Sequence, residues 1–125
     1  MLDKSLVLEC LLKIEETILH IQERTKNINA PEDFSKTPNG VDMLDVAVVR
    51  LEAIGETIKN IDKNTEGLLL QKYPDIPWRK IMKMRDIIAH HYFDVDEDII
   101  FNIVKNELDI LLTTTRSMQN DTLLK

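Results

Sequence analysis

Apolar residues recur at steps of three and four over long stretches of this chain, and this spacing constrains the fold more than any other feature. In the first stretch the residues that keep the spacing are Val7, Leu11, Ile14, Ile18 and Ile21, and the stripe is widened by Leu8, Leu12 and Leu19. Residues three and four apart share one face of an α-helix. Only 3 Gly and 4 Pro occur among 125 residues, and aromatic residues make up 5%, so strand and hairpin signals are weak. The pattern predicts an all-α fold.

Breaks in the pattern divide the chain into helices. The first helix is expected over about residues 3–27, followed by an irregular loop, NAPEDFSKTPNG, which contains two prolines and a glycine. The second helix is expected to begin near Val41. Its buried face is predicted to contain Leu44, Ala47, Val48, Leu51, Ile54, Ile58 and Ile61. Gly55 falls on the same side as that face, one position after Ile54. Because glycine costs roughly 1 kcal/mol relative to alanine within a helix, we expect another helix to approach closely there.

The second half of the chain predicts two further main helices. A short helical turn is expected over residues 64–70, and the third main helix begins at residues 75–78 and ends near Tyr92. Acidic residues at 94–98 supply the cap and first turn of the fourth helix. Its apolar stripe is Ile100, Val104, Leu108, Leu111 and Met118. The last five residues, DTLLK, are expected to fray. The prediction is one domain over residues 1–125, an antiparallel bundle of four main helices plus one short helix.

Composition and charge exclude several classes of protein. With 43% apolar and 30% charged residues, the chain resembles soluble globular proteins. The net charge of −6 argues against broad nucleic-acid binding, although Arg79, Lys80, Lys83 and Arg85 place four cations within seven residues. The single cysteine, Cys10, excludes an intrachain disulfide and predicts a reducing, cytoplasmic location. No apolar run reaches the ~18 residues of a membrane span, and MLDKSLVLE does not resemble a signal peptide.

The stretch RDIIAHHY, residues 85–92, gathers side chains that support catalysis. On an ideal helix a polar face contains Arg79, Lys83, Asp86 and His90. Asp86 and His90 are four apart, and a carboxylate orients an imidazole and favours its protonated form, which suits a general acid or base. Arg85 lies about 140° from His90 around the helix. Either the helix loosens there, the arginine reaches around it, or a second subunit completes the site.

Each of these residues also has an ordinary structural interpretation. Arg85 could pair with an acid of another helix, for which the candidates are Glu52, Glu56 and Asp109. His90 could occupy a helix C-terminus that favours positive charge, His91 could be a half-exposed filler, and Tyr92 could anchor the helix end through its ring. No metal site is expected, because adjacent histidines on a helix diverge and no second ligand group follows at a useful spacing.

The motif formed by arginine, a polar residue, three residues, histidine, any residue and tyrosine resembles the signature of HEPN-domain ribonuclease toxins. The subgroup is HepT, the toxin half of MntA/HepT toxin–antitoxin pairs. The likeness extends to three segments, DMLDVAVVRLEAIGETIKNI, YPDIPWRKIMKMRDIIAHHYFDVD and DIIFNIVKNELDILL. It covers most of the chain from Asp42 to Leu112, and the first helix fits only by its pattern.

The resemblance implies a HEPN-like bundle that acts as a homodimeric endoribonuclease without metal or cofactor. Arg85 and His90 would be the catalytic pair, with Asp86 in support. The RNA's own 2′-hydroxyl would be the nucleophile, histidine would move a proton, and arginine would hold the phosphate. Asp86 occupies a position that is often asparagine in the family. Its negatively charged carboxylate would repel a phosphate bound beside it. The residues expected to bind RNA are Arg79, Lys80 and Lys83, called here the basic cluster.

The resemblance also implies a regulating partner. The tyrosine matching Tyr92 is modified by an MntA-like nucleotidyltransferase antitoxin, which attaches AMP and silences the toxin. An anionic adduct there would block RNA by bulk and by like charge. Two alternatives remain open. The chain could be a noncatalytic helical subunit that presents a nucleotide or substrate to a transferase, with the basic cluster binding phosphate, or Arg85 could serve only as a salt-bridge residue at a subunit interface.

Overall fold

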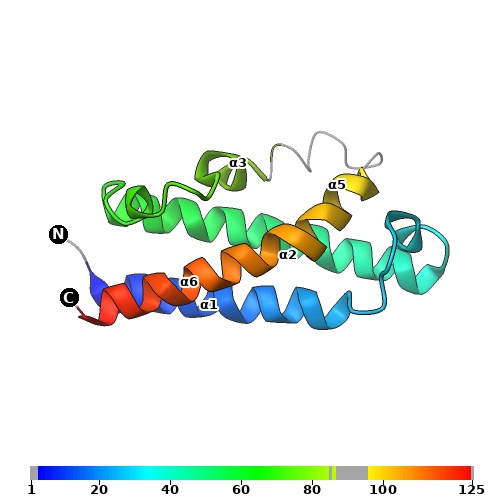
Figure 1. Ribbon diagram of the computed structural model, residues 1–125, viewed down its shortest axis with the longest axis horizontal. Coiled ribbons are helices and arrows are strands. Elements are labelled where there is room, and N and C mark those ends of the chain that lie inside the picture. The colour runs from blue at the N-terminus through cyan, green and yellow to red at the C-terminus, as the bar shows by residue number, and fades with distance from the viewer. Residues whose placement is uncertain (1–2, 85, 87–95, 125) are drawn as a thin grey trace.

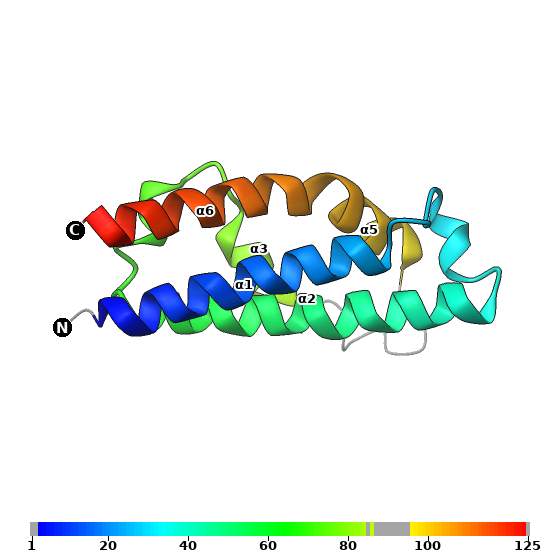
Figure 2. The same cartoon turned by 90° about the horizontal axis from the view of Figure 1, so that it is seen from below.

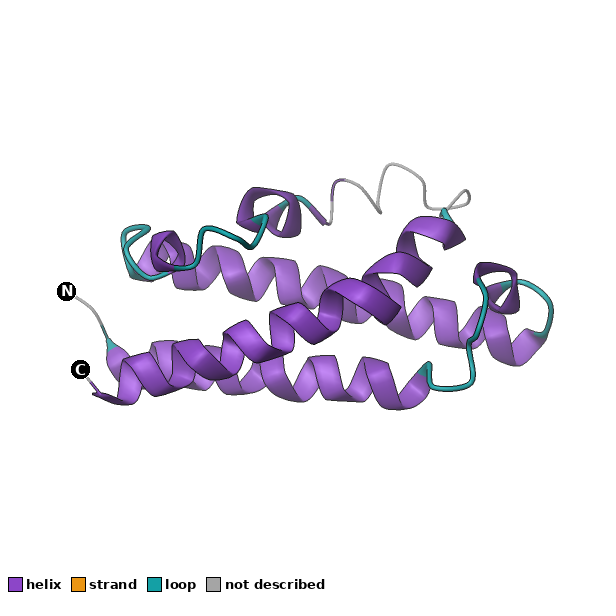
Figure 3. Cartoon of the chain, viewed as in Figure 1, coloured by secondary structure: helices purple, strands orange, loops and turns teal. Residues whose placement is uncertain are grey.

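Three long helical segments run side by side through the computed structural model, which describes residues 3–84, 86 and 96–124 (Figure 1). They are α1 (Lys4–Arg24), α2 (Pro38–Asn64), and a C-terminal segment made of α5 (Glu97–Asn102), a π-helical turn η3 (Ile103–Glu107) and α6 (Leu108–Leu124). The described residues contain no strand (Figure 3). The predicted all-α fold is therefore confirmed.

The arrangement places α1 between α2 and α6, and both neighbours run antiparallel to it (Figure 2). Three shorter elements connect the long ones: 3₁₀ turns at η1 (Pro31–Phe34) and η2 (Leu70–Lys72), and the short helix α3 (Trp78–Met82). Among the described residues no helix is both long and apolar enough to cross a membrane.

Polar side chains fix where the helices begin. Asp3 caps α1 by accepting the Leu6 N–H at 3.1 Å. Asp96 caps α5 by accepting the N–H groups of Asp98 and Ile99 at 2.9 and 3.3 Å. Such caps satisfy donors that have no partner inside the helix. The predicted acidic start of the last helix is thus confirmed.

The second helix begins earlier than the sequence predicts. It starts at Pro38, three positions before Val41, because Thr37 accepts the Gly40 N–H at 2.9 Å and proline suits the first helical position. The preceding loop is also less irregular than predicted. It contains the 3₁₀ turn η1, which buries the ring of Phe34 completely.

The predicted apolar stripes form the core. The stripe residues spaced by three and four in the first and fourth helices are at most 5% exposed, whereas Leu44 and Val48 of the second helix are half-buried. The expected widening of the first stripe is wrong for Leu12 and Leu19, which are 50% and 44% exposed, while Leu8 is half-buried. The apolar helical pattern around Cys10 predicts a buried small hydrophobe, but the side chain is only half-buried. This burial raises the pKa of its thiol. It therefore packs against the core as a neutral side chain.

The C-terminal tail does not fray as predicted. Helix α6 continues through Leu124 because two of its last residues are held by the rest of the fold. Thr122 is 9% exposed, and the Tyr73 hydroxyl donates to Asp121 Oδ2 at 3.1 Å. Terminal residues are ordered when such contacts hold them.

The third helix is described only in part. Helix α3 begins at Trp78 with Pro77 as its cap, and Trp78 Nε1 donates to the Tyr73 carbonyl at 2.9 Å. The chain turns at Lys83 and is helical again at Met84 and Asp86. The rest of the helix predicted to reach residue 92 lies outside the described residues.

Gly55 brings α3 against α2, as predicted. A Cβ atom at this position would lie 2.7 Å from the Ile81 carbonyl oxygen and 3.5 Å from Met84 Cβ. The first distance is shorter than real Cβ contacts, and the neighbour is backbone, which cannot rotate away. The absence of a side chain at Gly55 therefore allows the backbone of α3 to pack this closely against α2.

We expect Gly55→Ala to lower the free energy of unfolding, since overpacking costs roughly 1–3 kcal/mol and alanine returns only about 1 kcal/mol of helix propensity. Urea denaturation followed by circular dichroism measures the change. The control is Asn60→Ala at an exposed position of α2, which should leave stability unchanged or slightly raised. Equal stability of both variants would show that α3 adjusts to the added methyl group.

Candidate functional site

Four of the residues predicted for the site are described, and all four are exposed. They are the basic cluster, Arg79, Lys80 and Lys83, together with Asp86. The predicted polar side of the third helix is thus confirmed at Arg79, Lys83 and Asp86. The remaining site residues, Arg85, His90 and Tyr92, lie outside the described residues, as does His91.

Lys80 is the member of the basic cluster with a carboxylate partner. Its Nζ lies 3.8 Å from Glu107 Oε1 and so connects α3 to the π-helical turn η3. Glu107 Oε1 also accepts from Asn102 Nδ2 at 3.5 Å. Both partners of the ion pair are well exposed, at 53% and 39% of their side-chain surfaces, so the pair contributes at most about 1 kcal/mol. Within the described part of the chain Arg79 and Lys83 form no ion pair.

One hollow lies between α3 and the start of the last helical segment, on the α5 side of Glu107. This α5-side hollow has a volume of about 310 Å³. It is lined by Lys80, Met84, Asp98, Ile99, Asn102, Ile103 and Glu107. Because Met84 immediately precedes Arg85, the hollow adjoins the start of the RDIIAHHY stretch in sequence.

A second, more apolar hollow of about 220 Å³, the α6-side hollow, lies between α2, α3 and α6. It is lined by Leu51, Ile54, Asp75, Ile76, Pro77, Ile81, Met84, Ile103, Glu107, Leu108, Ile110 and Leu111. Both hollows share Met84, Ile103 and Glu107. The sequence does not identify Glu107 as a neighbour of Lys80, because only the packing of α3 against η3 brings the two together.

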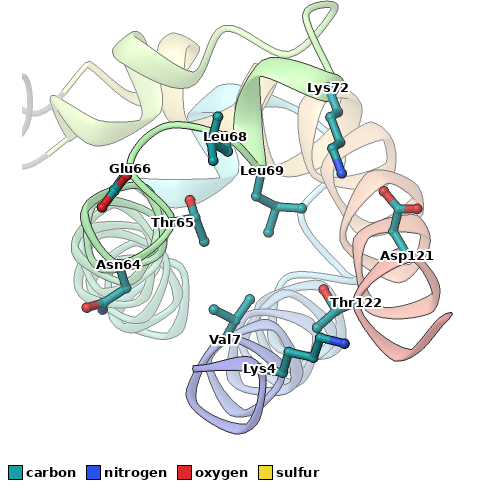
Figure 4. Close-up of a pocket in the computed structure, with 10 residues that line it drawn as sticks. All are labelled: Lys4, Val7, Asn64, Thr65, Glu66, Leu68, Leu69, Lys72, Asp121 and Thr122. Carbon is teal, nitrogen blue, oxygen red and sulfur yellow. The ribbon is translucent and has the colours of Figure 1, made fainter. Parts of the chain in front are cut away.

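A third hollow, of about 380 Å³, lies at the end of the bundle that holds both termini. Figure 4 shows Val7, Leu69 and Thr122 around it, from the start of α1, the turn after α2 and the end of α6, with Lys4 and Lys72 at its edge. It shares no lining residue with the two hollows beside α3 and is separate from the predicted site.

The acids proposed as structural partners of Arg85 differ in their surroundings. Glu56 lies 3.5 Å from Lys59 Nζ, and Asp109 Oδ1 accepts from Gln22 Nε2 at 2.8 Å. Two of the three candidate carboxylates thus interact with other side chains. Glu52 is half-buried on α2. The salt-bridge interpretation of Arg85 remains a prediction.

Metal binding finds no support in the part of the chain that the structure describes. No three His, Cys, Asp or Glu side chains among those residues gather closely enough to hold an ion.

The fold and the sequence together define a class of protein. It is a helical bundle in which a short basic helix packs against a glycine of α2 and is followed in the sequence by an Arg-x4-His-x-Tyr motif. A family model described as "Ribonuclease HepT-like" matches residues 14–118. The chain therefore belongs to the HepT-like ribonuclease family. The matched range includes the basic cluster and the whole of residues 85–92.

Relatives in three prokaryotes agree with this assignment. A Thermococcus cleftensis protein described as a probable ribonuclease HepT is 39% identical over 102 residues, which is 78% of this chain and 82% of the relative. A candidate RNase of Caldanaerobacter subterraneus is 40% identical over 87 residues, covering 69% and 70% of the two chains. A candidate RNase of Methanocaldococcus jannaschii is 41% identical over 63 residues, about half of each chain. No solved structure gives a significant match.

Proposed function

We propose that this chain is a metal-independent endoribonuclease that acts as a homodimer, with Arg85 and His90 as its catalytic pair. The observation that carries the proposal is the match of residues 14–118 to the HepT-like ribonuclease family. Relatives described as ribonucleases support it, and so does the exposed basic cluster one turn before the motif.

The reaction requires no group beyond the RNA and these side chains. The ribose 2′-oxygen attacks the phosphorus while the bond to the 5′-oxygen breaks, which leaves a 2′,3′-cyclic phosphate and a 5′-hydroxyl. His90 takes the proton of the 2′-hydroxyl and returns a proton to the departing 5′-oxygen, and the Arg85 guanidinium donates to phosphate oxygens as negative charge develops. In a homodimer the arginine and histidine of two subunits share one cleft, which offsets their angular separation on one helix.

We expect Arg85→Ala and His90→Ala each to slow cleavage of total RNA by roughly 100-fold or more. A positioned acid–base group such as His90 contributes roughly 10²–10⁴-fold, and loss of one donor to a developing negative charge, the role of Arg85, costs roughly 10²–10³-fold. The assay contains excess EDTA and identifies the product ends. The matched control is His91→Ala, which removes the neighbouring histidine and should retain activity.

Full cleavage by both variants would remove the catalytic assignment, and a strict requirement for a divalent metal would indicate another mechanism. If the wild-type protein binds nucleotide but cleaves no RNA, the noncatalytic subunit is the correct interpretation.

The basic cluster is proposed to bind the RNA backbone. With cleavage blocked by His90→Ala, Arg79→Ala and Lys83→Ala should each reduce the slope of log affinity against log salt by about 0.7, the value for one phosphate contact to a single strand. Lys80→Ala should have a smaller effect, because Lys80 already pairs with Glu107. Fluorescence anisotropy with a labelled single-stranded RNA measures the slopes. Lys13→Ala on α1 is the control, and equal slopes in all variants would contradict this role.

We further propose that the protein is a toxin silenced when a partner nucleotidyltransferase attaches AMP to Tyr92. Tyr92→Phe should therefore cleave RNA and arrest growth but escape modification, as shown by intact-mass spectrometry after incubation with the transferase and ATP. Tyr73→Phe is the control, because Tyr73 is half-buried and its hydroxyl donates to Asp121. AMP found on another residue would contradict this assignment.

A further inference from the structure

We propose that the α6-side hollow binds a guanine base of the RNA substrate and that Asp75 at its rim reads the base. This inference rests on the proposed ribonuclease function and extends it to a base preference. The hollow and the residues used here all belong to the described part of the chain.

The hollow has the dimensions and lining of a site for one flat, largely apolar group. Its volume of about 220 Å³ lies below the roughly 300–1,000 Å³ of pockets for drug-sized ligands. Aliphatic side chains make its walls, and those that are at most 5% exposed are Leu51, Ile54, Met84, Ile103, Leu108 and Leu111. Proteins commonly recognise single-stranded RNA by enclosing an unstacked base.

Two carboxylates at this hollow differ in their partners. Glu107 already interacts with Lys80 and Asn102. The exposed Asp75 side chain, in contrast, forms no hydrogen bond or ion pair with any described residue. An ionised carboxylate only accepts hydrogen bonds, so Asp75 is available to a ligand that donates them.

Guanine is the base that matches such an acceptor. Its Watson–Crick edge presents the N1–H and the N2 amino group side by side, and both can donate to the two oxygens of one carboxylate. Adenine and cytosine each present a single amino donor beside an acceptor, and uracil presents one N–H between two acceptors. Asp75 should therefore favour guanine over the other three bases.

The charges beside the hollow suit a base carried on a phosphate backbone. Among the described residues, the lining of the hollow includes two carboxylates, Asp75 and Glu107, and no cation. Lys80 pairs with Glu107 at the edge of the hollow, Arg79 lies on the same short helix, and Lys83 follows that helix as its C-cap. A neutral base can enter the apolar hollow while the phosphate to which it is attached follows these cations.

The test compares cleavage of oligonucleotides that are identical except for one guanosine, which is replaced by inosine, adenosine, cytidine or uridine. Inosine lacks only the N2 amino group. We expect wild-type protein to cleave the inosine substrate about tenfold more slowly than the guanosine substrate, and the other three more slowly still. Asp75→Asn should cleave the guanosine substrate about tenfold more slowly than wild type and no longer distinguish it from inosine. The control is Asp42→Asn, an exposed aspartate of α2 that lines neither α3 hollow.

A binding measurement separates this inference from the proposed function. In methyl NMR spectra of the full chain, GMP should shift the signals of Ile76, Ile81 and Ile110, and AMP should not. Cleavage without preference for guanosine, or equal loss in the Asp42 variant, would overturn the guanine site and leave the ribonuclease intact. If wild type cleaves no RNA, the proposed function fails, and GMP-specific shifts that disappear in Asp75→Asn would still support the pocket, whereas their absence would reject it.

Discussion

The contact between Gly55 of α2 and the Ile81 carbonyl of α3 determines where the basic helix lies. A side chain at residue 55 would meet backbone at 2.7 Å, so α3 can approach this closely only over a glycine. Glycine costs roughly 1 kcal/mol in a helix interior, and the burial of Met84, at 4% exposed, offsets that cost. The residue before Arg85 is thus fixed by packing. The catalytic role proposed for Arg85 would benefit from such support, because small displacements of catalytic groups are costly.

The π-helical turn η3 supports α3 from the other side. It interrupts the last helix where that helix passes both α1 and α3, and π-helical turns often mark functional sites. Lys105 of the turn donates to the Thr25 carbonyl at the end of α1 at 2.8 Å, while Glu107 faces Lys80. One turn of backbone therefore connects the end of the first helix with the basic helix, and its Ile103 forms a wall of both hollows.

Local signals predicted the helices well because each depends on a few neighbouring residues. The apolar stripes, the acidic start of α5 and the close approach at Gly55 were all evident from spacing and residue type. The early start of α2 is not evident from the sequence, because Thr37 lies in a stretch whose prolines and glycine predict a loop. The ordered C-terminus is not evident either, because it depends on Tyr73, far away in the sequence. For the same reason no pattern indicated that Glu107 lies beside Lys80. The pair Arg85 and His90 followed from a family resemblance, since helical spacing alone separates them.

The proposed function requires an acidic chain to bind RNA beside α3, and the short range of electrostatic forces in salt solution allows this. At physiological ionic strength the Debye length is about 8 Å, so a carboxylate farther than this from α3 contributes little to the potential there. Among the described residues, the carboxylates that line the two hollows beside α3 are Asp75, Asp98 and Glu107, and Glu107 pairs with Lys80. A phosphate would be repelled by these carboxylates and attracted by Arg79 and Lys83. In the proposed complex the RNA backbone would therefore lie toward the cations, with a base edge toward Asp75.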